Sequence, residues 1–329
     1  MKQSITIISI FFFTTFYVNA QTIERQVIGA AGTTFSNANI TAEFTVGETA
    51  TATISNGIVT FSQGFHQETI KLEIFINPKI YLQGAALSPN TGEENLMRDD
   101  LRVASLVPTT SPYTDGLTCD ASVFNTTGAN AIVDWVWIEL RAATDNTSIL
   151  YSTSALLQRD GDIVATDGVS VLSFNAAVDN YFIAIKHRNH LGIMTSTAIL
   201  IDTTSADFTN ASNQITFGNN AQTTSGMPNG ITVMWSGNAN NDTVIQYSGI
   251  TPDTPAILSE ILNDPGNFLN FPTYVVSGYN ANDVNMNGST QYSGTNPDTP
   301  LILQNVLAHP GNFLNFSTYQ ITEQLPENN

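Results

Sequence analysis

The chain has 329 residues, of which 28 are acidic and 10 are basic, so its formal net charge is −18. Nucleic-acid binding by counterion release requires clustered Lys and Arg, yet none follows Arg188. This balance argues against a nucleic-acid partner and disfavours an anionic membrane surface. An acidic half with no lysine is instead a reasonable host for divalent cations.

Residues 1–20 have the pattern of a secretory signal peptide. Lys2 provides the positive start, Ile5–Phe16 is a short and mostly apolar stretch, and Val18–Ala20 is a small-residue cleavage site before Gln21. No stretch has the length and apolar character of a good membrane span. We therefore expect a secreted or cell-surface protein with no membrane span.

Residues 21–76 alternate between apolar and polar side chains over Ile40–Val46, as strands do. Asn56-Gly57 predicts a hairpin that joins Thr51–Ser55 to Ile58–Phe61. The stretch FTVGETATATISNGIVTFSQGFHQ resembles a common N-terminal segment of surface proteins from Gram-negative bacteria with a type-IX-like export route.

Residues 77–225 predict a second β region, in which short strands are separated by Gly, Asp and Asn turns. This pattern favours an antiparallel sandwich of about immunoglobulin size. The predicted strands are Ile132–Leu140, Ser148–Gln158, Val169–Phe174 and Asn180–Lys186.

Residues 226–329 contain one unit twice, 45 positions apart, and a duplicated unit usually packs against its copy. Each unit has an Asn/Asp-rich loop, a Gln-Tyr-Ser-Gly motif, a Pro-Asp-Thr-Pro motif, an apolar helix pattern and the motif Pro-Gly-Asn-Phe-Leu-Asn-Phe. The helix patterns are Ile257, Leu258, Ile261 and Leu262 in the first copy, and Ile302, Leu303, Val306 and Leu307 in the second.

The loop of the second copy has oxygen-bearing side chains at alternate positions, which is the spacing of a calcium loop. Asp283, Asn285 and Asn287 stand at positions 1, 3 and 5. Gly288 follows where a sharp turn is required, and Ser289 offers its carbonyl.

The loop of the first copy has the same spacing but fits less well. Asn238, Asn240 and Asp242 stand at positions 1, 3 and 5, and Val244 offers its carbonyl. Thr243 occupies the position that prefers Gly.

Neither loop has Glu at position 12, and the next acidic residue is Asp253 or Asp298. We predict that this aspartate closes each Ca²⁺ site across a longer loop, with an affinity of ~10⁻⁴ M because only two carboxylates contribute. Two alternatives remain open. The loops are also typical of Asn/Asp turns without metal, and Asp253 and Asp298 are also expected to cap the helices that follow.

These residues resemble the dockerin-like, EF-hand-related calcium repeats of secreted bacterial surface proteins over residues 231–325. The resemblance implies calcium-dependent folding. The inserted Tyr-Ser-Gly…Pro-Asp segment and the missing last ligand make inheritance of cohesin binding less expected. The runs ANAIVDWVWIELR, SALLQRDGDIV and NYFIAIKHRNHLGIMTS resemble a module that precedes such repeats in haemagglutinin-type or adhesin-type proteins, over residues 79–197.

Other residues have a functional and a structural interpretation. Trp135 and Trp137 share a strand face, where they either stack on sugars or pack in a core. His187 and His190 suggest zinc, but Lys186 and Arg188 beside them oppose it. The remaining candidates, with turn or core roles as the simpler interpretation, are the pair Asp99 and Asp100, the group Asp160, Asp162 and Asp167, and the thiol of Cys119.

We therefore predict a mainly β fold: an N-terminal β-hairpin segment, an immunoglobulin-like antiparallel β-sandwich and a small α-containing duplicated calcium-loop domain. The predicted function is non-catalytic adhesion, display or assembly, with a protein or glycan partner at the cell surface. A glycan-binding accessory module is the alternative. A glycan-cleaving enzyme is weaker, because no pair of carboxylates with the required arrangement is visible.

The exported protein is expected to begin at Gln21, because cleavage follows the small residue of Val18–Ala20. N-terminal mass spectrometry of the secreted protein measures this directly. Retention of residues 1–20 on the exported chain would contradict the signal-peptide interpretation.

Overall fold

The computed structural model describes residues 72–201 and 206–327, together with the backbone of four short strands closer to the N-terminus. The chain divides into two compact units, Met1–Ile70 and Lys71–Asn329. The predicted signal peptide lies outside the described residues. Within them, no helix is long and apolar enough to cross a membrane.

Where the structure describes the first unit, two antiparallel strand pairs are present, β1 with β2 and β3 with β4. These strands are β1 Ala31–Ser36, β2 Thr41–Val46, β3 Ile54–Ser55 and β4 Thr60–Phe61. The pairing of β3 with β4 joins the two segments of the predicted hairpin, with Ile54 opposite Phe61 and Ser55 opposite Thr60.

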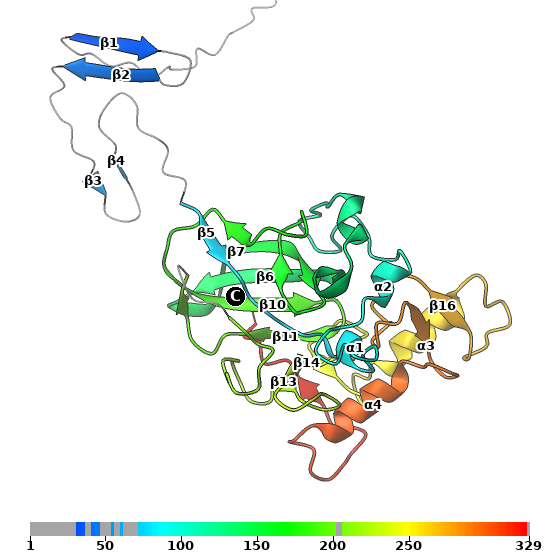
Figure 1. The fold of residues 1–329 in the computed structure, drawn as a ribbon. Helices are drawn as coiled ribbons and strands as arrows, with labels where there is room; N and C mark the ends of the chain where they lie inside the picture. Colours follow the sequence, from blue (N-terminus) through cyan, green and yellow to red (C-terminus); the bar gives the residue numbers. More distant parts are fainter. Residues whose placement is uncertain are drawn as a thin grey trace, which may run out of the picture. The chain divides into compact units, whose positions relative to one another are not determined.

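The second unit is built on an antiparallel sheet in the order β11-β10-β6-β7-β8, with β12 also paired to β10 (Figure 1). The strands are β6 Ile132–Ala142, β7 Asp145–Gln158, β8 Ile163–Val164, β10 Asn180–His187, β11 His190–Met194 and β12 Ile199–Leu200. Three of the four predicted strands therefore lie in this sheet as its central members.

The fourth predicted strand, Val169–Phe174, is shorter and lies elsewhere. It is present as β9, Leu172–Phe174, and pairs with β5, Ile74–Ile76. Both strands alternate buried and exposed residues and contribute to the same core as Trp135. The mainly β class is confirmed. The immunoglobulin-like sandwich stays a prediction, because the other sheets of the described residues have two strands each.

The two repeats exchange strands. The strand after the first loop pairs with the strand that follows the second helix, and the strand after the second loop pairs with the one that follows the first helix. Each copy thus completes the other, as the duplication predicts. The elements are β15 Val244–Ile245 with β18 Ile321–Thr322, β16 Val275–Ser277 with β17 Ser289–Gln291, and the helices α3 Thr254–Asn263 and α4 Thr299–Ala308.

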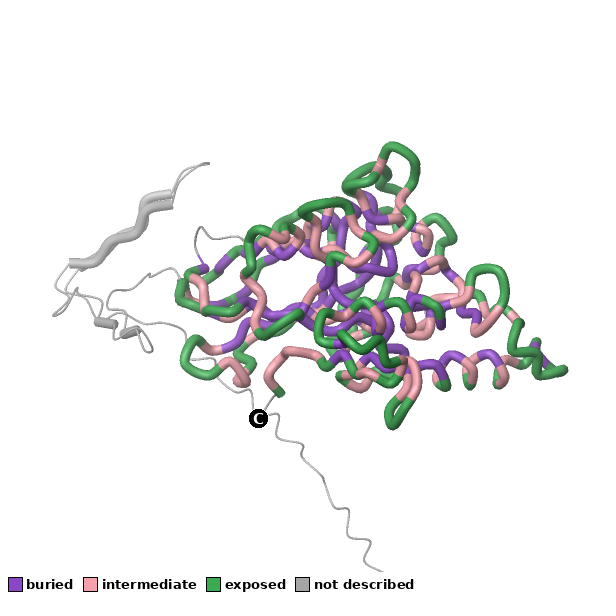
Figure 2. The backbone as a smooth tube through the Cα atoms, turned by 90° about the horizontal axis from the view of Figure 1, so that it is seen from below, coloured by how far each residue is buried: buried purple, intermediate pink, exposed green. Residues whose placement is uncertain are grey.

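The predicted helical faces form a second core beneath these strands. Ile257 and Ile261 of α3 meet Ile302 and Val306 of α4, and all four are buried together with Trp235. Figure 2 shows the buried positions recurring along the helical turns of the repeats. The helices therefore bury apolar stripes that neither copy could cover alone.

Shorter elements join the large sheet to the repeats. They are β13 Gln222–Thr223 with β14 Val233–Met234, the helices α1 Gln83–Ala86 and α2 Asp100–Val103, and the 3₁₀ turns η1 Ala121–Asn125 and η2 Gly128–Asn130. Gln83 of α1 and Asn305 of α4 form a reciprocal amide pair, with N–O distances of 2.8 and 2.7 Å. The Asn305 amide also donates to the Ser236 carbonyl at 2.7 Å.

We expect Asn305→Ala to lower the free energy of unfolding by roughly 2 to 3 kcal/mol, because it leaves buried amide and carbonyl groups of Gln83 and Ser236 without their partner. Gln304→Ala, at an exposed position of the same helix, is the matched control and should change stability by less than about 0.5 kcal/mol. Urea unfolding of the two variants makes the comparison. Equal effects would show that the amide pair does not fasten α4 to α1.

Candidate metal centres

The second loop wraps its backbone around the predicted ligands. Asp283 accepts hydrogen bonds from the Asn287 nitrogen at 3.0 Å and the Gly288 nitrogen at 2.9 Å. Asn285 accepts from Asn287 at 3.1 Å, and Asn287 accepts from the Ser289 nitrogen at 2.9 Å. Positions 1, 3 and 5 of the loop therefore turn their side-chain oxygens into one bend.

Asp298 closes this loop from the far side through hydrogen bonds to its backbone, and its predicted role as a Ca²⁺ ligand stays a prediction. Its Oδ1 accepts from the Val284 and Asn285 nitrogens at 3.0 and 3.3 Å, and its Oδ2 accepts from the Gln291 nitrogen at 2.8 Å. Asp283 and Asp298 are both fully buried. Two carboxylates thus belong to one loop although fifteen positions separate them in the sequence.

The first loop repeats the closure. Asp253 accepts from the Ala239 nitrogen at 2.8 Å, from the Asn240 nitrogen at 3.3 Å and from the Gln246 nitrogen at 2.8 Å. Its side chain is fully buried. Because the two aspartates bind the loops at equivalent positions, the arrangement belongs to the repeat unit itself.

The expected helix capping by these aspartates is wrong. Asp253 and Asp298 do precede α3 and α4, with Pro in the first turn, but neither side chain bonds to a helix N–H group. Their oxygens are already engaged by three loop amides each, which compete for the same lone pairs. The two carboxylates therefore bind the backbone of the loops and not the N-termini of the helices.

The two loops differ at the sharp turn, as the sequence predicts. Gly288 has a φ of 85° and Thr243 has a φ of 55°. A β-branched residue in the left-handed region is strained. The backbone of the first loop therefore has a higher conformational energy at Thr243 than the second loop has at Gly288.

The leading position also differs between the loops. Asn238 accepts from the Asp242 nitrogen at 3.0 Å with its one amide oxygen, where Asp283 offers two oxygens. Asp242 accepts from Val244 at 2.8 Å, and its other oxygen accepts from the Asn240 amide at 2.9 Å. The first loop therefore presents fewer carboxylate oxygens to a cation.

Burial raises the pKa values of the loop carboxyl groups. The pKa of Asp298 rises to about 8 through burial and the charge of Asp283. The pKa of Asp253 rises to about 7 through burial. Burial raises that of Asp283 to about 6, against the opposing effect of Arg188. Ionisation of both carboxyl groups would put two like charges in a dry environment, which is unfavourable without a cation, so Asp298 keeps its proton until about pH 8.

The carbonyl donors predicted from the sequence lie at the first positions of strands. Ser289 begins β17 opposite Ser277, and Val244 begins β15 opposite Thr322. Among the described residues, no group of three or more His, Cys, Asp and Glu side chains could hold a metal. Any cation in these loops must therefore rely on amide and carbonyl oxygens beside the two carboxylates.

A buried polar cluster that the sequence did not predict joins the large sheet to the second loop. Asp134 of β6 accepts from Arg188 at 3.1 Å and from the Tyr279 hydroxyl at 2.6 Å. Asn189 donates to the Asp283 carbonyl at 2.7 Å. Although burial alone would raise the pKa of Asp134, the positive charge of Arg188 and the bond from His187 hold it at about 2.

The two histidines proposed for zinc are part of this cluster. Their Nδ1 atoms lie 3.0 Å apart, the His187 Nε2 lies 3.1 Å from Asp134, and the His190 Nε2 accepts from the Gly84 nitrogen at 3.2 Å. Burial lowers the pKa of both imidazoles. Both rings are therefore neutral structural links between the sheet and α1.

The remaining sequence candidates have local partners. Asp99 pairs with Arg102, and Asp100 with Arg98. Cys119 is buried, which raises the pKa of its thiol. The turn carboxylates Asp160, Asp162 and Asp167 bond to the Asp162 nitrogen, Lys79 and Ser170, respectively.

The two tryptophans of β6 differ in their burial and in their hydrogen-bond partners. Trp135 is fully buried and donates from Nε1 to the Pro108 carbonyl at 2.8 Å, so its core interpretation is confirmed. Trp137 is half-buried and donates to Glu139 at 3.2 Å.

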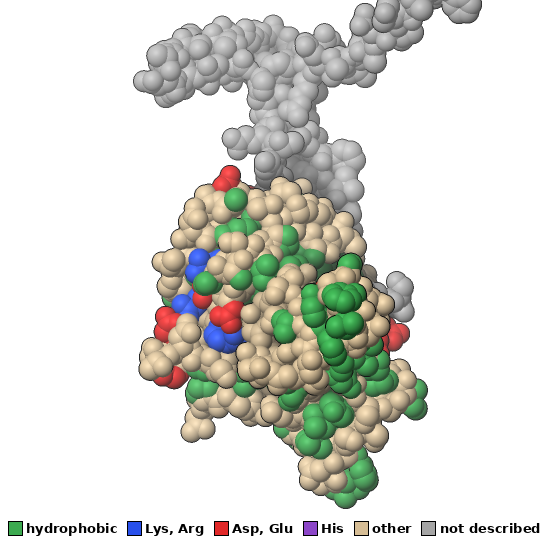
Figure 3. Space-filling model, turned by 90° about the vertical axis from the view of Figure 1, so that its right-hand side faces the viewer, with side chains coloured by type: hydrophobic (Ala, Val, Ile, Leu, Met, Phe, Trp, Pro, Cys, Tyr) green, Lys and Arg blue, Asp and Glu red, His purple; other side chains and the backbone are tan. Residues whose placement is uncertain are grey.

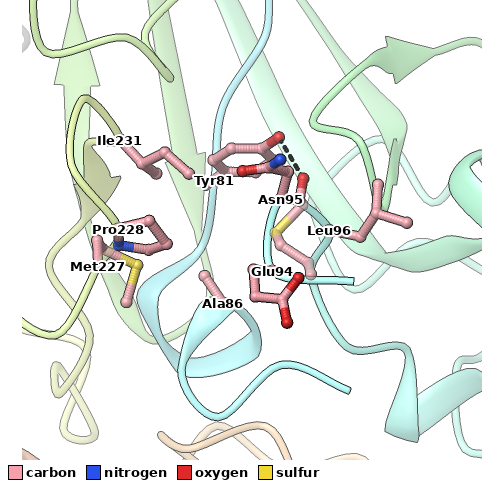
Figure 4. Close-up of a pocket in the computed structure, with 9 residues that line it drawn as sticks. Tyr81, Ala86, Glu94, Asn95, Leu96, Met227, Pro228 and Ile231 are labelled. Carbon is pink, nitrogen blue, oxygen red and sulfur yellow. Dashed lines mark hydrogen bonds between the residues drawn. The ribbon is translucent and has the colours of Figure 1, made fainter. Parts of the chain in front are cut away.

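A separate pocket beside Tyr81 has a volume of about 10 Å³, which is room for a single water (Figure 4).

Comparison of the chain with protein-family models, with curated proteins and with solved structures gave no match.

In the presence of a chelator, the free energy of unfolding should fall as the pH rises from about 5 to 8. Asp298 keeps its proton to about pH 8 in the folded state but loses it near pH 4 when unfolded, so unfolding releases protons across this range. The expected loss is on the order of a few kcal/mol. Urea titrations at several pH values measure it.

Asp298→Asn should flatten this dependence, because the replaced group cannot titrate. Asp145→Asn is the control: it removes an exposed turn carboxylate in the β6–β7 hairpin and should keep the slope. A slope that is the same in Asp298→Asn and in the unmodified chain would contradict the raised pKa.

Proposed function

We propose that this chain is a secreted, non-catalytic surface protein for adhesion, display or assembly, whose C-terminal repeats are stabilised by calcium. The ligands would be the side chains of Asp283, Asn285, Asn287 and Asp298 with the Ser289 carbonyl, and the side chains of Asn238, Asn240, Asp242 and Asp253 with the Val244 carbonyl. Oxygen donors of this kind suit a hard cation.

The observation that carries the calcium proposal is the pair of fully buried carboxylates in the second loop. Asp283 and Asp298 both turn into the same bend, and the charge of Asp283 raises the cost of ionising Asp298 by repulsion. A divalent cation would remove that repulsion and would complete its coordination with the neighbouring Asn oxygens. Asp298 already accepts three loop N–H bonds, so a cation would use its remaining lone pair or displace one of these amides.

The resemblance to dockerin-like repeats and to adhesin-type modules supports this proposal. The proposal also includes an immunoglobulin-like sandwich in residues 77–225. The core that the β5–β9 pair shares with the large sheet supports this sandwich. The export signal of residues 1–20 would place the protein outside the cell or at its surface.

Two exposed apolar tips support an adhesive or assembly role. Phe268 is 81% exposed and Phe313 is 82% exposed, at equivalent positions of the two copies. Buried Asn267 and Asn312 fix these tips, because each exchanges hydrogen bonds with the backbone four residues later. Figure 3, which faces the side where α3 and β16 lie in Figure 1, shows hydrophobic side chains gathered in patches. Such patches are typical of interaction surfaces.

Calcium should bind the two loops unequally, because the second has Gly288 at the turn and a carboxylate at position 1. Asp283→Ala should abolish the tighter step of a calorimetric calcium titration, whereas Asp242→Ala should remove mainly the weaker step. Calcium at a hundredfold excess over the dissociation constant should also stabilise the unmodified chain by ~2.7 kcal/mol in thermal melts.

Asp145→Ala, which removes a carboxylate far from both loops in the sequence, is the control and should retain both binding steps. Equal losses in the two loop variants, or a larger loss in Asp242→Ala, would show that the ranking is wrong. Melting curves that superimpose with calcium and with chelator would refute the metal proposal itself.

A further inference from the structure

A cleft of about 640 Å³ lies between the large sheet and the first repeat loop. Its lining includes Trp137 of β6 and Tyr113, and also Asn241, Asp242 and Thr243 of the loop. Its volume is within the range of natural small-molecule sites, which is about 300–1,000 Å³. Residues more than a hundred positions apart therefore meet around one space.

The aromatic wall is held rigidly. The rings of Tyr113 and Trp137 lie 5.7 Å apart at 36°. The Trp137 indole donates to Glu139, which also binds Arg141 and Lys186. Trp137 is half-buried although its neighbour Trp135 is fully buried. A fixed, partly exposed aromatic surface can bind a ligand with a low cost in conformational entropy.

The two cations that line the cleft, Lys186 and Arg188, are each paired with a carboxylate. Lys186 lies 2.9 Å from Glu139, and Arg188 lies 3.1 Å from Asp134. Glu323 accepts from the Gly192 nitrogen at 2.8 Å. Because both cations are paired and the lining also contains the carboxylates of Asp242 and Glu323, the cleft disfavours an anionic ligand. A neutral ligand needs no charged partner in it.

The rim adds polar groups that face solvent. Asn241 and Thr243 are exposed, and both have a left-handed backbone, with φ values of 58° and 55°. Strained residues of this kind concentrate at binding sites. A cleft lined by aromatic rings together with an amide and a hydroxyl matches a pyranose ring, which has an apolar C–H face and a margin of hydroxyl groups.

We propose that this cleft binds a neutral oligosaccharide, with a sugar ring on Trp137 and its hydroxyl groups on Asn241 and Thr243. This inference rests on the proposed adhesive function, and it names neutral oligosaccharides as the class of partner to which the protein adheres. Its aromatic wall comes from the large sheet, whereas Asn241 and Thr243 belong to the first loop, so calcium in that loop would act on the rim and not on Trp137.

The test uses residues 21–329 and a panel of neutral oligosaccharides, namely cello-, xylo-, malto- and chito-oligosaccharides, immobilised as an array. Affinities of bound members are then measured by calorimetry. Trp137→Ala should weaken binding by about tenfold, the upper range for loss of one aromatic contact. Asn241→Gly should weaken it by about threefold to tenfold, as expected for a lost hydrogen bond.

Asn241→Gly also protects the test against misfolding, because Gly adopts a positive φ without strain. Asn315→Gly is the matched control: Asn315 is exposed with a φ of 55° but belongs to the apolar tip of the second copy, so affinity should not change. Failure of every panel member to bind at millimolar concentration would overturn the proposal. So would binding that Trp137→Ala and Asn241→Gly leave unchanged.

All measurements are repeated in a chelator so that this inference and the calcium proposal can fail separately. Saccharide binding in a chain that binds no calcium would support the cleft and refute the metal centres. Calcium binding without any saccharide binding would refute only the cleft.

Discussion

A buried carboxylate that gathers three backbone amides is the interaction on which each repeat depends. Asp253 and Asp298 reach from the start of a helix back across the preceding loop and bond to both of its ends. These bonds set the direction in which the helix leaves the loop. They also hold the strand after the loop, β15 or β17, where it can pair with the opposite copy. Loop, helix and exchanged strand therefore form one cooperative unit.

This geometry leaves an electrostatic problem in the second loop. Three backbone N–H groups are a good environment for one carboxylate, but Asp283 is buried next to Asp298. Protonation of Asp298 below about pH 8, or a divalent cation that displaces this proton, would each relieve the repulsion. The two solutions have opposite dependences on pH, so the same carboxyl groups would make the metal-free and the calcium-bound protein respond differently to acid.

The repeats are not an independent appendage of the large sheet. The Gln83–Asn305 amide pair joins α1 to α4, while the cluster around Asp134 joins β6 and the β10–β11 turn to the second loop. Buried polar groups of this type are costly unless fully bonded, so they favour a single relative placement of sheet and repeats. The cleft between Trp137 and the first loop has defined walls for this reason.

Much of the repeat region follows from local sequence. The 45-residue period, the helical spacing of Ile257 and Ile261, and the turn glycine Gly288 determine the helices, the loops and their duplication, because these features depend on near neighbours and on backbone conformation. The same holds for the long strands around Trp135. The alternation of oxygen-bearing residues also identified Asp283, Asn285 and Asn287 as neighbours in space.

Where a local sequence pattern is compatible with more than one arrangement, the tertiary structure decided between them. The Asp-Thr-Pro motif is equally suited to a helix cap and to loop closure, and only the competing loop amides turned Asp298 away from the helix. The pairing of β9 with β5 and the exchange of strands between copies depend on long-range partners, which a short strand does not specify. The cluster of Asp134, Arg188 and Tyr279, like the cleft beside Trp137, exists only because distant segments pack together.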